Sequence, residues 1–249
     1  MSQSLERGME ILTLIGSKPK SVAELSGALG VHPTTALRLV HSLRKSHFVS
    51  VLDDGRYSLG PALIGLGHQA LESSDLRTLA RPFLCELNET TTETVHMAAL
   101  FGTDIVYVDK VEAKHSVRIE SRVGSVVLTY CTGVGKAVLS CLNETDLAEQ
   151  CKTIDFHRFT ATTITSLEAL DRELEVTRAR GYSVDNEEHE AEICCVAVPV
   201  WSATGEVMGS ISVSAPASRV ALPGLIEFLP DLQHAAAGVS SLLGYRPAR

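Results

Sequence analysis

Apolar residues near the start of the chain recur at helical spacing in short stretches that are bounded by helix start and stop signals. The first stretch ends where glycine and proline occur, at residues 16–19, and predicts an amphipathic helix. Its expected inner face consists of Leu5, Met9, Leu12 and Ile15. The second stretch begins with the capping-box pair Ser21 and Glu24, and it ends at Gly30, which permits a sharp bend.

A third helix is expected from Thr34 to about Lys45, because Pro33 suits the first helical turn. The residues available for packing on it are Leu37, Leu39, Val40 and Leu43. Two β-prone runs follow, at residues 48–51 and 56–59, and Asp53-Asp54-Gly55 between them predicts a hairpin. Two helices followed directly by a hairpin indicate a winged helix-turn-helix, with a reader helix and a wing.

This arrangement predicts a DNA-binding surface. The residues expected to face DNA are Thr34, Thr35, Arg38, His41 and Arg44 on the reader helix and Arg56 on the wing. The reader helix would enter the major groove, and the wing would contact the backbone or the minor groove. The alternative is a small helical subdomain without a ligand. Any single pattern would be weak evidence, and it is their combination that favours DNA.

A connector joins this unit to the rest of the chain. Residues 62–71 form an apolar stretch after Gly60-Pro61 that we expect to be helical, and the short polar segment 72–75 ends in an N-cap residue. We therefore expect a winged helix-turn-helix domain over residues 1–60, a linker helix over 61–74 and a second domain over 75–249.

The second domain mixes helical and strand-like patterns. Helices are expected at 76–90 and 133–142, from the capping box Thr165/Glu168 to Gly181, and at about 222–243. Strands are expected at 94–101, 105–111, 117–121, 193–201 and 207–214. Pairs of strands joined by short turns, with helices between them, predict an α+β fold with an antiparallel sheet and flanking helices, as in a sensor domain.

The composition is that of a soluble globular protein, with 45% hydrophobic and 21% charged residues. No apolar run approaches the ~20 residues that span a bilayer, and the first residues lack the pattern of a signal peptide. We expect a cytoplasmic protein. The six cysteines include no Cys-x-x-Cys pair, so in a reducing compartment we expect free and mainly buried thiols.

The net charge of −8 at first argues against a nucleic-acid partner. The charge is unevenly distributed, however. Residues 1–75 carry seven basic and seven acidic residues, whereas residues 76–249 carry fifteen and twenty-three. The neutral N-terminal part can still present one basic face to DNA, with the acidic part directed away from the phosphates. The charge is compatible with DNA binding and does not require it.

Gly133-Val134-Gly135-Lys136 is reminiscent of a phosphate-binding loop, but the pattern fails. Tyr130 occupies the place of the first glycine, and Ala137 occupies that of the magnesium-binding hydroxyl. A glycine-rich helix start still exposes N–H groups that can hold a smaller anion such as a carboxylate. In the alternative, the glycines only allow tight packing.

The run after residue 184 is strongly acidic. We interpret Glu187, Glu188, Glu190 and Glu192 as a solvated loop. Asp185 and His189 have the i, i+4 spacing of two metal ligands, but no third ligand is evident, and we expect neither a metal site nor a cofactor. Ser212 and Ser214 alternate on one expected strand, so both hydroxyls face the same side. On these residues alone, that side can equally be a solvent-facing one.

Four stretches together resemble the IclR family of transcriptional regulators over nearly the whole chain. They are residues 4–12, residues 29–39, Thr132-Gly133-Val134-Gly135-Lys136-Ala137, and residues 181–195 with 209–216. The resemblance implies a DNA-binding domain joined by a linker helix to a GAF-like effector domain. It also implies assembly as a homodimer or a dimer of dimers.

The resemblance further implies an effector site. Gly133 and Val134 match positions that hold an organic-acid effector in the family, and Asp185 and Cys195 match positions that contact it. Matching wall positions are Ser116, Ile119, Val127 and Ile193, and Ser212 and Ser214 would complete the polar side. Three of the four wall residues are aliphatic, which suggests that part of the ligand is apolar. A carboxylate beside a carboxylate ligand is costly, so Asp185 would accept from a hydroxyl, a hydrate or an amide unless a proton is shared.

We therefore predict a ligand-responsive transcription factor that binds a palindromic operator as a dimer and responds to a small organic acid or an aromatic acid derivative. Repression is favoured over activation, although the sequence does not decide between them. One alternative is a small-molecule enzyme with an accessory helical domain, for which no Gly-x-Ser-x-Gly elbow or other nucleophile motif is present. Another is a protein-binding winged-helix scaffold.

Overall fold

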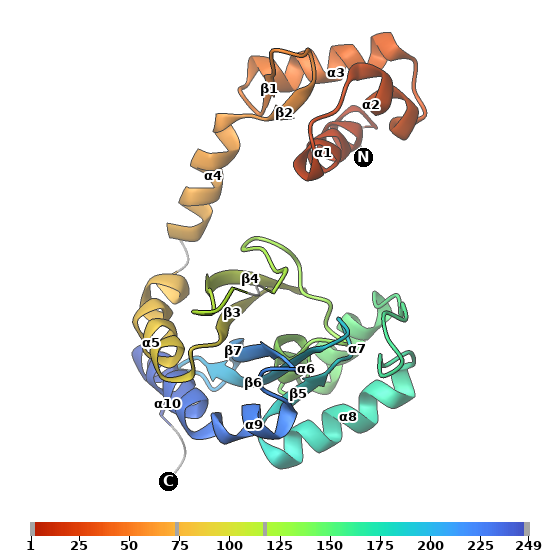
Figure 1. Ribbon diagram of the computed structural model, residues 1–249. Coiled ribbons are helices and arrows are strands. Elements are labelled where there is room, and N and C mark those ends of the chain that lie inside the picture. The colour runs from red at the N-terminus through yellow and green to blue at the C-terminus, as the bar shows by residue number, and fades with distance from the viewer. Residues whose placement is uncertain (1–2, 73–74, 117–118, 247–249) are drawn as a thin grey trace. The chain divides into compact units, whose positions relative to one another are not determined.

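The computed structural model describes residues 3–72, 75–116 and 119–246. The chain forms two compact units, Met1–Ser73 and Ser74–Arg249, each with a hydrophobic core of its own. No helix in the described ranges is both long enough and apolar enough to cross a membrane. Figure 1 shows the elements of both units.

The first unit contains a three-helix cluster, a hairpin and a further helix. Its elements are α1 (Gln3–Ser17), α2 (Val22–Leu29), α3 (Pro33–Lys45), β1 (Val49–Val51), β2 (Tyr57–Leu59) and α4 (Pro61–Glu72). The strands pair antiparallel. Its core is built from residues of α1, α2, α3 and the hairpin: Ile11, Ile15, Leu25, Val40, Val49 and Tyr57. The predicted order of helices and hairpin is therefore confirmed.

Local signals set the ends of α2 and α3. The hydroxyl of Ser21 accepts the Glu24 N–H at 3.3 Å, and the Ser21 N–H donates to the Glu24 carboxylate at 2.7 Å, which completes the capping box. Gly30 has a φ of 61° and ends α2 in the left-handed region that glycine adopts without strain. His32 then caps α3, where its Nδ1 accepts the Thr34 N–H at 3.4 Å. These contacts build the turn before α3.

The predicted inner face of α1 was partly wrong. Leu5 and Met9 are 62% and 57% exposed, and the buried residues of this helix are Gly8, Ile11 and Ile15. Ile15 is buried as predicted and Leu12 packs half-buried against the core, but Ile11, which lies beside the predicted stripe, is buried in place of Leu5 and Met9. On α3, Leu37 is only half-buried and lies outside the core residues.

The second unit is a five-stranded sheet with helices on both faces. Its strands are β3 (Thr94–Phe101), β4 (Asp104–Val111), β5 (Ser183–Asn186), β6 (Ile193–Trp201) and β7 (Val207–Pro216). Its helices are α5 (Asp75–Thr91), α6 (Gly133–Leu139), α7 (Glu144–Lys152), α8 (Leu167–Arg180), α9 (Leu222–Glu227) and α10 (Leu229–Leu242). The strand order is β4-β3-β7-β6-β5, and every neighbouring pair is antiparallel. The predicted α+β fold is confirmed.

The two faces of the sheet differ in chemistry, because side chains alternate along each strand. One face is apolar, with Met97, Val196 and Val213 packed against α5, α9 and α10. α6 packs against β6 and β7 on the other face, where Ala98 and Ala197 contact it. The same face carries polar residues beyond the start of α6, and this is where a cavity opens.

Several details differ from the expected elements. Residues 119–121 of the expected strand 117–121 are not in a strand, and residues 117 and 118 lie outside the described ranges. α6 ends at Leu139 and not at residue 142, and the expected last helix is divided into α9 and α10. The cap of α8 is Ser166, whose hydroxyl accepts the Ala169 N–H at 3.2 Å, and not Thr165.

Candidate functional site

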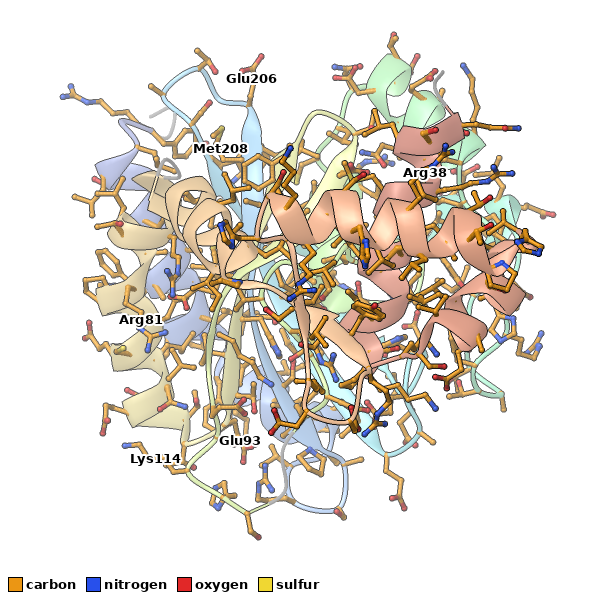
Figure 2. All side chains as sticks on the ribbon, turned by 90° about the horizontal axis from the view of Figure 1, so that it is seen from above. Arg38, Arg81, Glu93, Lys114, Glu206 and Met208 are labelled. Carbon is orange, nitrogen blue, oxygen red and sulfur yellow. The ribbon has the colours of Figure 1, made fainter. Side chains whose placement is uncertain are left out.

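A shallow groove on the outer face of α3 gathers polar and basic side chains. It is lined by Thr34, Leu37, Arg38, His41, Ser42 and Lys45, which share one face at helical spacing. Of the residues predicted to face DNA, the groove contains Thr34, Arg38 and His41, and Figure 2 labels Arg38 on this helix. Ser42 and Lys45 were not predicted, although they follow Arg38 and His41 at i+4.

The other predicted DNA-facing residues lie outside this groove. Thr35 is half-buried, and Arg44 is exposed in the last turn of α3. On the hairpin, the Nε of Arg56 donates to the Asp54 carboxylate at 2.6 Å, and both side chains are about half exposed. These hydrogen bonds hold the pKa of Asp54 below its usual value. Arg56 is thus already paired within its own hairpin.

The second unit contains a cavity of about 350 Å³ between the polar face of the sheet, the start of α6 and the segment 119–128. Most of the predicted effector residues line it: Ile119, Gly133, Val134, Asp185, Ile193, Cys195, Ser212 and Ser214. Two do not. Ser116 is exposed, and Val127 is buried in the apolar cluster beneath α6.

The register of the sheet brings these distant residues together. Cys195 on β6 lies opposite Asp185 on β5 and also opposite Ser214 on β7. Residues directly opposite each other on antiparallel strands point to the same face, so these three form one row across the cavity floor. Ser212 lies opposite His96 in the neighbouring row. In the part of the chain that the structure describes, the buried Ser212 hydroxyl lacks a hydrogen-bond partner.

The start of α6 forms the wall above this row. Thr132 caps the helix by accepting the Gly135 N–H at 3.2 Å, and the Ser183 hydroxyl donates to the Gly133 carbonyl at 2.6 Å. A Cβ atom on Gly133 would lie 2.7 Å from the Cys195 sulfur. Tight packing therefore requires glycine here, and the first-turn N–H groups of a helix have no intrahelical acceptor.

Asp185 is the buried carboxyl group of the cavity, with 6% of its surface exposed. Its Oδ1 accepts the Glu188 N–H at 2.8 Å. Burial, together with the nearby Glu188 carboxylate, raises the pKa of Asp185 to about 7. Beside it, burial and the charge of Asp185 raise the pKa of the Cys195 thiol to about 12, so this thiol is neutral.

The interpretation of Glu188 as part of a solvated loop was wrong. Glu188 is buried, and its two carboxylate oxygens accept hydrogen bonds from the Lys136 Nζ at 2.5 and 2.6 Å. Lys136 is fully buried on α6, and the Thr163 hydroxyl donates to the Glu188 carbonyl at 2.6 Å. Burying a charged group is energetically costly unless it is paired and hydrogen-bonded in this way. Glu190 and Glu192 are exposed, as expected for a solvated loop, and Glu187 is half-buried.

Two strand residues that were not predicted also line the cavity. His96 is buried, and its Nε2 lies 2.7 Å from the Ser121 hydroxyl. Burial and the nearby Lys110 lower the pKa of His96 to about 3, so it is neutral. Burial also raises the pKa of Tyr107. Because side chains alternate along a strand, the positions of His96 and Tyr107 within the expected strands were the only signal in the sequence of the sheet face on which they lie. Arg122 adds a guanidinium group from an exposed position.

The segment over the cavity is held from the edge strand β4. Lys110 donates from its Nζ to the carbonyl of Ile119 at 2.7 Å and to that of Ser121 at 3.3 Å. No group of three potential metal ligands occurs among the residues that the structure describes. The cavity thus offers hydrogen-bonding groups and an apolar wall to a small organic molecule.

Comparison with known proteins identifies both units. The IclR helix-turn-helix domain matches residues 4–52, and the bacterial transcriptional regulator IclR C-terminal domain matches residues 68–241. The chain belongs to the IclR family. It is therefore a transcriptional regulator and not an enzyme, since its curated relatives are named regulators and repressors.

Among its relatives is the HTH-type transcriptional regulator XynR of Escherichia coli K12, which is 34% identical over 98% of each chain. The crystal structure of the Thermotoga maritima IclR matches with a TM-score of 0.79 at 34% identity, covering 97% of this chain and 99% of that one. An IclR homologue from Microbacterium hydrocarbonoxydans, complexed with 4-hydroxybenzoate, has a TM-score of 0.81 at 22% identity and shares the fold over 97% of this chain and 99% of that one.

Proposed function

We propose that this IclR-family regulator is a ligand-responsive repressor that binds a palindromic operator as a dimer, controlled by a small organic acid or an aromatic acid derivative. In this proposal residues 1–60 bind DNA, 61–74 form the linker helix and 75–249 bind the effector. The observation that carries it is the convergence of Gly133, Asp185, Cys195 and Ser214 on one cavity. A repressor is favoured because several relatives are named repressors.

The chemistry of the cavity suits a small acid with an apolar part. Ile119, Val134 and Ile193 supply aliphatic surface, and the first-turn N–H groups of α6 can donate to a carboxylate. The homologue complexed with 4-hydroxybenzoate supports a ligand of this class. A regulator needs only a difference in ligand affinity between two arrangements of the protein, and a tenfold change in operator affinity needs ~1.4 kcal/mol.

The DNA-binding part of the proposal predicts that two arginines contribute to operator binding in different ways. Arg38→Ala is expected to weaken binding to the specific operator by about 1–3 kcal/mol, because the side chain lies in the groove on α3. Arg56→Ala is expected to weaken binding more evenly across sequences and to flatten its salt dependence. Gel-shift titrations at several salt concentrations measure both effects. Binding like that of the parent in both variants would contradict the placement of the interface.

The effector part predicts that the cavity can be blocked without loss of DNA binding. Cys195→Trp is expected to weaken binding of 4-hydroxybenzoate, or of the tightest acid from a panel of organic acids, at least tenfold because the indole takes up the cavity. Asp185→Ala removes one buried hydrogen-bonding group and is expected to weaken the binding free energy of the effector by about 0.5–3 kcal/mol. Both variants are expected to bind operator normally. Cys195→Trp is also expected to lose the response to ligand.

Cys195→Ser is the matched control, since it keeps the size of the side chain and is expected to bind ligand. Calorimetry with the acid, paired with operator binding, measures these effects, and circular dichroism checks that each variant is folded. An unchanged response to ligand in Cys195→Trp would place the effector elsewhere.

A further inference from the structure

We propose that the cavity binds an organic acid as its anion together with one proton, which Asp185 holds as a neutral carboxylic acid that donates a hydrogen bond to the ligand's carboxylate. The inference rests on the proposed function and specifies the ionic form in which the effector is bound. It makes operator control by the ligand dependent on pH.

The first support is the position of the carboxyl group. Asp185 lines the cavity with only 6% of its surface exposed. It receives a backbone hydrogen bond from the Glu188 N–H to Oδ1 at 2.8 Å and a weaker one from the His189 N–H, and burial outweighs both. An ionised carboxylate in such a place needs several donors or a cation of its own, because burial disfavours the charged form.

The second support is that the nearest cation is already committed. The ammonium of Lys136 contacts both carboxylate oxygens of Glu188, at 2.5 and 2.6 Å. The side chains of Lys136 and Glu188 are 0% and 8% exposed, so the two charges compensate each other inside the protein. Lys136 is thus neutralised by Glu188 and is not the dedicated partner of Asp185, which the Glu188 carboxylate repels.

Apart from Arg122, whose guanidinium lines the cavity from an exposed position, the remaining titratable groups around Asp185 supply no further positive charge. Beyond Lys136 on α6 and Glu188 in the turn after β5, the groups whose charged forms interact with Asp185 are Cys195 on β6, Cys131 before α6 and Tyr107 on β4. His189, in the same turn as Glu188, also lines the cavity, and its contact with Asp185 is through its backbone N–H. Burial raises the pKa of the two thiols and of the phenol, and it lowers the pKa of His189. All four are therefore neutral at physiological pH.

A ligand carboxylate entering this site would meet a second carboxylate. Two like charges at close range in a buried site do not both stay ionised, and one of them takes up a proton. The proton comes from solvent and stays on Asp185, which changes from an acceptor into an O–H donor to the anion. Hydrogen bonds of this kind are short and strong.

Calorimetry of the full chain with 4-hydroxybenzoate, or with the tightest acid of the panel, tests this inference. Titrations in two buffers of different ionisation enthalpy give the number of protons taken up. We expect close to one proton per ligand at about pH 8 and close to none at about pH 5.5. We also expect affinity for the anion to fall up to tenfold per pH unit above pH 7. Binding without proton uptake at about pH 8 would overturn the inference.

Two variants separate Asp185 from other carboxyl groups. Asp185→Asn places a permanent donor at the site and is expected to abolish both the proton uptake and the fall in affinity. Glu190→Gln is the matched control, because Glu190 lines the same cavity but is exposed. This variant is expected to keep the proton uptake. If proton uptake were lost in Glu190→Gln and retained in Asp185→Asn, the proton would be held by Glu190, and the assignment to Asp185 would be overturned.

The failure of each proposal has its own signature. If no organic acid binds at any pH, the proposed effector class fails. The protonation of Asp185, on which the inference rests, is tested separately on the ligand-free chain, by the carbon-13 carboxyl signal that is lost in Asp185→Asn. We expect this signal to titrate near pH 7. A signal already ionised at about pH 5 would overturn the inference independently of any ligand.

Discussion

Replacing Lys136 by methionine is expected to destabilise the effector domain by about 3–5 kcal/mol. The substitution leaves the buried carboxylate of Glu188 without its partner, and an uncompensated buried charge is among the most damaging single changes in a protein interior. The Lys136 side chain is fully buried, and its ammonium contacts Glu188 at 2.5 Å. Urea unfolding measures the effect through the fluorescence of Trp201, the single tryptophan of the chain, which lies on β6.

Two further variants show whether burial is the cause. Lys152→Met breaks an ion pair of similar length, 2.7 Å to Glu149, in which both side chains are exposed. It is expected to change the free energy of unfolding by less than about 1 kcal/mol. The double variant Lys136→Met/Glu188→Leu removes both buried charges and is expected to recover most of the lost stability. Equal effects of Lys136→Met and Lys152→Met would contradict this account.

Asp185→Asn is expected to stabilise the ligand-free effector domain increasingly as pH rises from about 4 to about 7. Below this range Asp185 is protonated in both the folded and the unfolded chain, so its ionisation contributes no difference. Within the range the unfolded carboxyl ionises while the folded one, whose pKa is raised from 3.8 to about 7, keeps its proton. The parent protein therefore loses stability relative to the variant, by up to roughly 4 kcal/mol.

Above about pH 7 the carboxyl is ionised in both states, and the difference between parent and variant is expected to stay constant. Unfolding curves of the two proteins across this pH range measure it, and their difference cancels the contribution of other titrating groups such as His96. Glu190→Gln, at an exposed carboxyl, is expected to follow the parent within about 0.5 kcal/mol. Parallel curves for parent and Asp185→Asn would show that Asp185 ionises normally in the fold.

The winged helix-turn-helix was predictable because its signals are local. The Ser21–Glu24 capping box, the left-handed Gly30 and the hairpin turn each act over a few residues, and each forms in the structure as the sequence indicates. The faces of the helices were harder to predict. Leu5 and Met9 have the spacing of a buried stripe, yet only the rest of the unit determines that Ile11 is buried in their place.

Elements that depend on partners far along the chain were missed. β5 is a four-residue strand beside a run of glutamates, and it is a strand because it pairs with β6. Glu188 was taken as solvated because its neighbours in sequence are acidic. Its partner Lys136 lies 52 residues earlier, and no local pattern indicates that contact.

In the candidate site, too, some features can be predicted from the sequence and others depend on contacts between distant residues. Most of the residues named by the resemblance to the IclR family line the cavity, but the resemblance did not supply their arrangement. The row formed by Asp185, Cys195 and Ser214 follows from the register of three strands. His96 enters the cavity because β3 pairs with β7. The charge state of Asp185 depends on burial and on Glu188, so it became visible only in three dimensions.

The pairing of Lys136 with Glu188 also has an evolutionary consequence. A single substitution at either position leaves a buried charge alone and passes through an unstable protein. Lineages that lose one partner are therefore expected to have replaced the other, so that the two positions change together. Lys136 lies on α6 three residues after Gly133, which lines the cavity, and the N–H of Glu188 donates a hydrogen bond to Asp185. Divergence in effector preference can thus be constrained by residues whose charges compensate each other and that the ligand need not touch.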